Sequence, residues 1–184
     1  LNDLISLIHL NLVKNELASI KNETLANLIN LERLDLRGNK ISEIESGSFQ
    51  NLFKLKNLHL EYNKLRFFEK NLFISLKNLE FMNLMNNEFE YIKSYYFDGL
   101  TKLKFLYLNT NKIRKVENNS FNDLSSLIEL YISYQNLSIF DSTTFHGLNS
   151  ITSLDIAQNN IYFLNKRTFS SMTNLFALYL SYNK

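Results

Sequence analysis

Residues 31–41 read LERLDLRGNKI, and the same apolar spacing returns 24 residues later as LKNLHLEYNKL at residues 55–65. Counted from Leu7, the apolar residue that opens this pattern recurs every 24 residues, from Leu31 through to Leu175. No insertion or deletion interrupts the register. A fixed period of this size predicts a solenoid, in which each unit buries its apolar face only by stacking on its neighbours.

Each 24-residue unit carries apolar residues at positions 1, 4, 6, 11, 14, 19 and 22 in every copy. Positions 4 and 6, such as Leu34 and Leu36, have the period-2 spacing of a short strand with one buried face. The other apolar positions are expected to form the second wall of the core. Position 19 is occupied by a column of large side chains that we expect inside the solenoid: Leu25, Phe49, Phe73, Phe97, Phe121, Phe145 and Phe169.

A polar residue at position 9 interrupts this apolar frame. A buried amide must be hydrogen-bonded, and one per unit can bond the backbone of adjacent turns, so we expect a ladder along the solenoid. The ladder positions are Asn15, Asn39, Asn63, Asn87, Asn111, Gln135, Asn159 and Asn183. Glutamine has the same donors and acceptors on a longer arm, so local adjustment near Tyr134–Asn136 is expected rather than a break. Neutral drift at this position is the alternative interpretation.

The pattern LxxLxLxxNxL identifies the chain as resembling the leucine-rich repeat family. The 24-residue length with Phe at position 19 is similar to the typical subclass of animal extracellular proteins, which includes Toll-like receptors, small proteoglycans and neuronal adhesion proteins. The resemblance implies a curved horseshoe segment, an α/β-type solenoid. In this fold a parallel β-sheet lines the concave side, and mostly irregular or short-helical return segments form the convex side.

Residues 1–184 are expected to form a single array of about seven full repeats from Leu7, with partial repeats at both ends. Leu1 and Leu4 fall at positions 19 and 22 of a preceding repeat, and Lys184 falls at position 10 of the eighth. Solenoids normally need capping units with a polar outer face. We therefore expect an internal part of a longer protein without its caps.

The composition excludes few functions, but it indicates which partners and which cellular location to expect. The net charge of +2 does not favour nucleic acid as a partner, and no apolar stretch approaches the ~20 residues that span a bilayer. The chain has no Cys, and Asn22, Asn118 and Asn136 begin sequons for glycosylation. About four sequons are expected by chance at this composition. The extracellular location therefore rests on the family resemblance alone.

Positions 3, 5 and 7 should point away from the core, because side chains alternate faces along a strand. On the stacked strands these outward positions form a grid, and its middle rows are rich in aromatic residues, which are common in binding hot spots. Rings that only stiffen the sheet are the alternative. The expected ligand-binding residues are Phe81, Phe105, Tyr107, Tyr131 and Met85, with His59, Glu61, Arg33, Asp35 and Arg37 beside them.

A row of basic residues marks the edge where the strands turn: Lys40, Lys64, Arg66, Lys112, Arg114 and Lys115. Such a row could hold phosphate or a sulfated glycan. Glu88 and Glu90 occupy the same columns in the intervening repeat, so a solvated rim is the simpler interpretation.

Catalysis has almost no support in the sequence. His9, His59 and His146 fall at unrelated positions, and neither a metal-ligand spacing nor a Gly-rich phosphate loop is present. We expect no enzyme, cofactor or metal site. The resemblance implies a receptor or secreted immune protein whose partner is a protein ligand or co-receptor. A structural or adhesion protein forming a homodimer, and an intracellular adaptor or substrate-recognition domain, are the alternatives.

Overall fold

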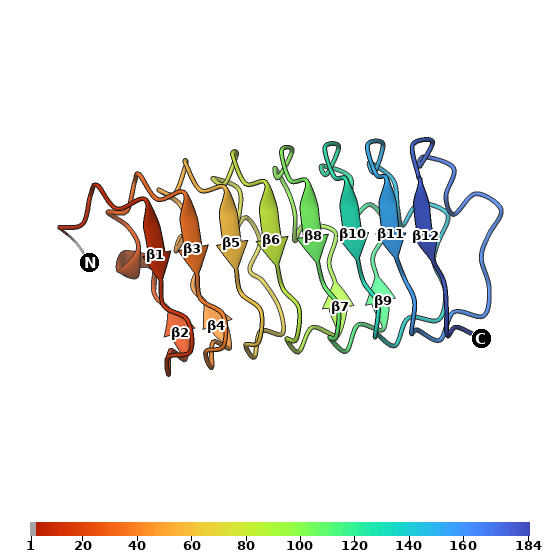
Figure 1. Ribbon diagram of the computed structural model, residues 1–184, viewed down its shortest axis with the longest axis horizontal. Coiled ribbons are helices and arrows are strands. Elements are labelled where there is room, and N and C mark those ends of the chain that lie inside the picture. The colour runs from red at the N-terminus through yellow and green to blue at the C-terminus, as the bar shows by residue number, and fades with distance from the viewer. Residues whose placement is uncertain (1–2) are drawn as a thin grey trace.

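The computed structural model describes residues 3–184, so Leu1 lies outside the described residues. Short parallel strands lie side by side along the whole length of the molecule (Figure 1). Every neighbour is offset by 24 residues, as in the pair His9 and Arg33. The eight strands of this sheet, in spatial order, are β1 (His9–Asn11), β3 (Arg33–Asp35), β5 (Asn57–His59), β6 (Phe81–Asn83), β8 (Phe105–Tyr107), β10 (Glu129–Tyr131), β11 (Ser153–Asp155) and β12 (Ala177–Tyr179).

The return segments are mostly turns. Two small parallel sheets interrupt them, one of β2 (Ser19–Ile20) with β4 (Glu43–Ile44) and one of β7 (Tyr91–Ile92) with β9 (Lys115–Val116). The 3-10 helix η1 (Asn22–Thr24) is the one helix in residues 3–184, and no helix there is long and apolar enough to cross a membrane. The predicted solenoid with irregular returns is confirmed.

Position 14 explains where the small sheets form. The paired strands place Ile20, Ile44, Ile92 or Val116 there, and β-branched residues favour extended backbone. The other repeats carry Phe68, Phe140 and Leu164 at the same position, and none of these residues lies in a return-side strand. One isolated bridge, between Ile139 and Phe163, is the only return-side pairing in those repeats within residues 3–184. The Phe68 ring packs instead on Phe73, with 4.8 Å between ring centroids.

The core fills the space between the sheet and the returns. The inward residues of the strands from β3 to β11, such as Leu34 and Leu36, have no exposed surface. The phenylalanines at position 19 stack on one another, with centroids 6.0 Å apart for Phe97 and Phe121 and 6.2 Å for Phe121 and Phe145. Each repeat therefore buries its apolar face against the next, as a solenoid requires.

The position 9 amides bond adjacent turns to one another. Nδ2 of Asn63 donates to the carbonyls of Leu36 and Leu60, each at 3.0 Å, and Oδ1 accepts the N–H of Ile41 at 3.0 Å. Gln135 makes the same links between turns, accepting from Ile113 at 3.0 Å and donating to Leu108 at 2.7 Å. Its second donated bond goes to Ser133 at 3.2 Å, so the longer side chain shifts one local contact and preserves the ladder.

Position 8 follows each strand and has a positive φ in all eight copies, between 53° and 68°. The residues there are Lys14, Gly38, Tyr62, Asn86, Thr110, Tyr134, Gln158 and Tyr182. Only Gly and, to a lesser degree, Asn adopt this conformation readily. The hydrogen bonds between turns therefore impose it on bulky side chains, and three exposed tyrosines are held at the edge of the sheet.

Candidate functional site

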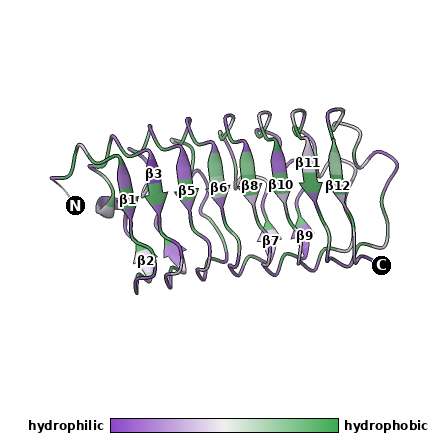
Figure 2. Cartoon of the chain, in the orientation of Figure 1, coloured by the Kyte–Doolittle hydropathy of each residue, from purple (hydrophilic) through white to green (hydrophobic). Residues whose placement is uncertain are grey.

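The concave face is the side of the eight-stranded sheet formed by positions 3, 5 and 7. Its character changes along the molecule (Figure 2), from mostly hydrophilic at β1 to β5 to more hydrophobic at β6 and β8. We divide it into three groups of residues, which adjoin one another across the strands.

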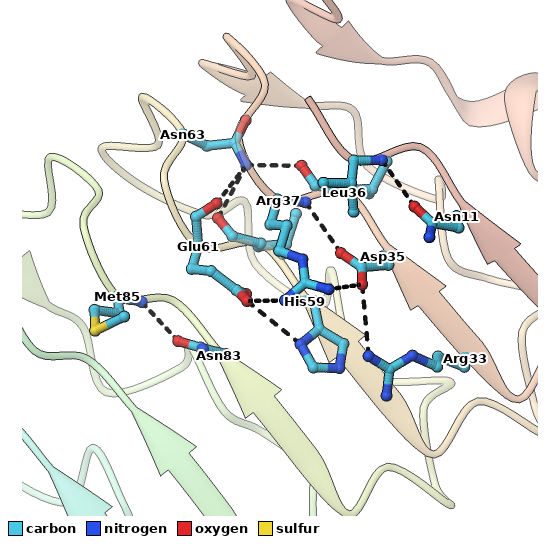
Figure 3. Close-up of polar contacts among 12 residues, drawn as sticks. Asn11, Arg33, Asp35, Leu36, Arg37, His59, Glu61, Asn63, Asn83 and Met85 are labelled. Carbon is cyan, nitrogen blue, oxygen red and sulfur yellow. Dashed lines mark hydrogen bonds and ion pairs between the residues drawn. The ribbon is translucent and has the colours of Figure 1, made fainter. Parts of the chain in front are cut away.

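The first group is the charge cluster, formed by Arg33, Asp35, Arg37, His59 and Glu61 on β3, β5 and the turns that follow them. One carboxylate oxygen of Asp35 lies 3.0 Å from Arg37 and 3.5 Å from Arg33. The Arg37 guanidinium also lies 3.8 Å from Glu61, so it bridges the two carboxylates (Figure 3). The two arginines therefore neutralise the two acids within the cluster itself.

The burial of this cluster corrects one expectation from the sequence. Asp35, His59 and Glu61 lie on the concave face as predicted, but their side chains are only 3%, 10% and 5% exposed. The long side chains of Arg33 and Arg37 fold over them, which alternation along a strand does not reveal. Only the two arginines, at 40% and 44%, offer substantial surface to a partner.

His59 lies between the charge cluster and the rings that follow. Its Nδ1 is 3.5 Å from Glu61, and its ring centroid is 4.8 Å from that of Phe81. Neither ring nitrogen has a hydrogen-bond partner, and Oε2 of Glu61 has none either. A buried polar atom without a partner is costly, so this part of the cluster is incompletely satisfied.

The second group is the aromatic ladder of Phe81, Phe105, Tyr107 and Tyr131, on β6, β8 and β10. Phe81 meets Tyr107 edge-on at 5.4 Å, and Tyr107 stacks on Tyr131 at 4.9 Å with only 12° between the rings. Phe105 lies 6.5 Å from Phe81, and all four side chains are partly exposed. Predicted Met85 is partly buried beyond β6. The rings thus brace one another and still present a surface.

The third group is the acceptor cluster of Asn109, Glu129, Ser133 and Asp155, which the sequence prediction did not include. Tyr107 donates its hydroxyl to Oε2 of Glu129 at 2.9 Å. Burial, and after it this bond to Glu129, raises the pKa of Tyr107. Asp155 accepts the backbone N–H of Ala157 at 3.0 Å. Within residues 3–184, no cationic side chain forms an ion pair with either carboxylate.

The other two members of the acceptor cluster have buried atoms that lack a partner. Ser133 is 1% exposed and its Oγ is unpaired, as is Oδ1 of Asn109. The two residues follow the paired strands β8 and β10. The N–H of Thr110, next to Asn109, donates to the carbonyl of Ser133 at 3.1 Å. The signal for this cluster was present in the sequence: acids next to the aromatic rows, with no basic residue at the outward positions beside them.

The basic edge is largely paired. Arg66 and Lys112 lie 2.9 Å and 3.6 Å from Glu88, and Lys40 pairs with Glu16. Arg114 likewise lies 3.6 Å from Glu90. The hydrogen bond from Arg66 is the main cause that lowers the pKa of Glu88. Ion pairs on an exposed edge contribute little individually, and this arrangement favours the solvated rim over an anion site.

Two further features concern modification and chemistry. The sequon residues Asn22, Asn118 and Asn136 are all exposed. The part of the chain that the structure describes contains no group of three His, Cys, Asp or Glu side chains placed to hold a metal ion.

A family model described as leucine rich repeat matches residues 29–89, 84–137, 102–161 and 125–184. A crystal structure of TLR13 in complex with ssRNA13 is 30% identical over 96% of this chain, with a TM-score of 0.84. A leucine-rich-repeat protein of Leptospira interrogans is 27% identical over 95%, with a TM-score of 0.73. This chain spans only 29% and 49% of those two chains. No curated protein matches.

The family model covers most of the chain, and both solved structures share its solenoid of parallel strands. Proteins with this repeat generally mediate protein interactions and are typically not enzymes. The chain belongs to the leucine-rich repeat family.

Proposed function

We propose that this chain is the recognition part of an extracellular receptor or a secreted immune-type protein, and that it binds a protein ligand or co-receptor on its concave face. The carrying observation is the aromatic ladder, whose rings are held by mutual contacts at 4.9 Å to 6.5 Å and remain partly exposed. A contiguous aromatic surface on a rigid sheet is typical of an interaction site.

The proposed mechanism depends on preorganisation. Tyr107 is fixed by its stacking on Tyr131 and its hydrogen bond to Glu129, both on β10, and by the edge-on contact with Phe81 on β6. A partner that covers these rings therefore freezes few side-chain rotations, and little conformational entropy is lost on binding. Arg33 and Arg37, already oriented by Asp35, would set the orientation of the partner through their exposed guanidinium groups.

The extracellular location is supported by the similarity to TLR13 and by the exposure of all three sequon asparagines. Passage through a secretory pathway would attach glycans at Asn22, Asn118 and Asn136. Expression in secreting animal cells should give a protein whose mass falls after treatment with an N-glycan-removing enzyme. An unmodified secreted product would leave the location without this support.

Nucleic acid is disfavoured as the partner, although the TLR13 structure is a complex with ssRNA13. Phosphates need unpaired cations. On the concave face, Arg33 and Arg37 are paired with Asp35. Glu129 and Asp155 would repel a phosphate backbone at the other end of the aromatic ladder. We expect no saturable binding of single-stranded RNA at physiological salt.

The test of the proposed function compares two variants against a panel of candidate extracellular proteins. Phe105→Ala with Tyr131→Ala should weaken partner binding by roughly 100-fold, as for hot-spot residues. Phe53→Ala with Phe67→Ala is the matched control, because these rings are 54% exposed and lie away from the concave face. Thermal melting checks that both variants fold. A folded ladder variant that binds normally would overturn the proposal.

Light scattering tests the adhesion alternative. If the chain forms a homodimer through the concave face, its average mass should rise with protein concentration, and this rise should be absent in the Phe105→Ala and Tyr131→Ala variant. A monomer at all concentrations would count against adhesion. An intracellular adaptor predicts partners among cytosolic proteins, and a panel of such proteins run in parallel tests that alternative.

A further inference from the structure

We infer that the acceptor cluster, at the β10–β11 end of the aromatic ladder, is a subsite for an arginine side chain of the protein partner. The inference rests on the proposed function in one respect, that the partner docks on the concave face. It assigns the partner a definite chemistry: a donor-rich planar cation placed next to the apolar surface that covers the rings.

The first support is uncompensated charge. Glu129 and Asp155 lie on adjacent strands, at Glu129↔Ser153 and Tyr131↔Asp155 in the register, and both are partly buried. Throughout the described residues neither has a cationic partner. Partly buried carboxylates are normally paired, and at β3 and β5 the same sheet supplies its own arginines for this purpose. At β10 and β11 the described residues supply no such cation, and an arginine of the partner would provide it.

The second support is the excess of hydrogen-bond acceptors. Oδ1 of Asn109 and Oγ of Ser133 are buried without partners, and their side chains project on the same face as Glu129 and Tyr131. Oδ1 of Asn109 only accepts, so a group that satisfies it must donate a hydrogen bond, and the Ser133 hydroxyl can accept one as well. A guanidinium has five N–H donors and no acceptor, so one such group carries enough donors for a carboxylate and for unpaired acceptors beside it.

The third support is the ring surface beside the acids. Tyr131 stacks on Tyr107 and borders Asp155 in the sheet register, and Tyr179 follows Asp155 on β12. A planar guanidinium can lie against such a ring while its edge bonds the carboxylates. A lysine would supply charge without the planar contact. These requirements together select arginine among the basic side chains.

The direct test titrates the protein with the tripeptide acetyl-Gly-Arg-Gly-amide and follows backbone amide resonances by NMR. Shifts should be saturable and concentrated at Asn109, Glu129, Tyr131, Ser133 and Asp155. The same peptide with citrulline, which keeps the shape and loses the charge, should bind about tenfold more weakly. A lysine peptide should fall between the two.

The variant Glu129→Gln with Asp155→Asn keeps the size of both side chains and should also weaken the arginine peptide about tenfold. Glu45→Gln with Glu117→Gln, which changes two carboxylates on the return side, is the matched control and should bind as the unmodified protein does. Unchanged amide spectra away from the substitutions show that each variant folds.

Equal binding of the arginine and citrulline peptides, or shifts that persist in the Glu129→Gln and Asp155→Asn variant, would overturn the inference. The two proposals fail separately. A protein partner that needs Phe105 and Tyr131 but binds the double acid variant normally would sustain the proposed function and reject the arginine subsite. An arginine peptide bound at this cluster, with partners indifferent to the aromatic ladder, would do the reverse.

Discussion

The charge cluster and the acceptor cluster occupy equivalent outward positions of one sheet, yet they differ in how their acids are satisfied. Asp35 and Glu61 are almost fully buried and share the guanidinium of Arg37. Glu129 and Asp155 remain partly exposed without a cation. The first arrangement is complete except at His59 and Glu61 Oε2, and it mainly contributes to the fold. In the second, the described residues provide no cation, and under our proposal the partner supplies one.

The difference shows that the pairing of charged side chains, more than their number, decides whether they are available to a partner. The charged residues at β3 and β5 were predicted from the sequence to orient a ligand. In the structure, most of them pair with one another. The two acids at β10 and β11 have no such internal partner and remain able to pair with a bound group. Four predictions can break or sharpen this comparison.

The largest effect should come from the amide ladder that lies beneath both clusters. Asn63→Ala, under the charge cluster, leaves the buried N–H of Ile41 without its acceptor, and Gln135→Ala does the same to Ile113. Each should lower the free energy of unfolding by about 2–4 kcal/mol in urea denaturation. Asn15→Ala is the control, because water can replace its exposed bonds. A much smaller loss of unfolding free energy for Gln135→Ala than for Asn63→Ala would mean that the amide ladder stabilises the two regions of the sheet unequally.

The next effect separates the clusters directly. Asp35→Asn leaves the guanidinium groups of Arg33 and Arg37 side by side without their anion, and we expect a loss of about 1–2 kcal/mol in unfolding free energy, reduced by the solvent that reaches the arginines. Asp155→Asn keeps the acceptor for Ala157 and removes unpaired charge, so stability should stay within about 0.5 kcal/mol. Equal losses would show that Asp155 is satisfied within the chain after all.

The repeat spacing was enough to predict the main sheet, because one apolar residue every 24 positions fixes both the strands and their register. Leu34 pairs with Leu58, and Leu106 with Leu130, in that register. The same alternation placed Phe81 and Tyr107 on the outward face. Their mutual contacts and their partial exposure fit both interpretations of the sequence, rings that stiffen the sheet and rings that bind a partner.

Other features depended on side-chain reach and tertiary context. No pattern of alternation shows that Arg37 folds over Asp35, although two arginines flanking one aspartate on a strand is a usable signal. The return-side strands went unpredicted because Ile44 and Phe68 are both simply apolar at position 14, and only β-branching distinguishes them. The positive φ of Tyr62 opposes its intrinsic preference, so it comes from hydrogen bonds between turns.

A smaller effect concerns alkaline pH, and Tyr107 connects it to the acceptor cluster. Burial raises the pKa of Tyr96 to about 12, and burial with the Glu129 bond raises that of Tyr107. Tyrosine is neutral below its pKa, and the unfolded chain loses the proton first, near pH 10. This stability is therefore complete below pH 10 and falls as the pH rises toward the folded values. Unfolding measured at pH 9 and pH 11.5 should show a shallower decline for Tyr107→Phe.

In that experiment Tyr162→Phe is the control, because its ring is 65% exposed and lies on the return side. An unchanged slope for Tyr107→Phe would show that its hydroxyl titrates alike in the folded and unfolded chains. The desolvation that we assign to the aromatic ladder next to the acceptor cluster would then be contradicted.

The smallest effect is expected at position 8, where Tyr62 follows the charge cluster and Tyr134 follows the acceptor cluster. Both hold φ near 57°, which asparagine adopts more readily, so Tyr62→Asn and Tyr134→Asn should each raise stability by up to about 1 kcal/mol in thermal melts. Both rings are more than half exposed. If partner contacts concentrate at the acceptor cluster, only Tyr134→Asn should also weaken partner binding. If both variants weakened partner binding equally, the interface would extend along the whole edge of the sheet, and the predicted difference between the two clusters would be wrong.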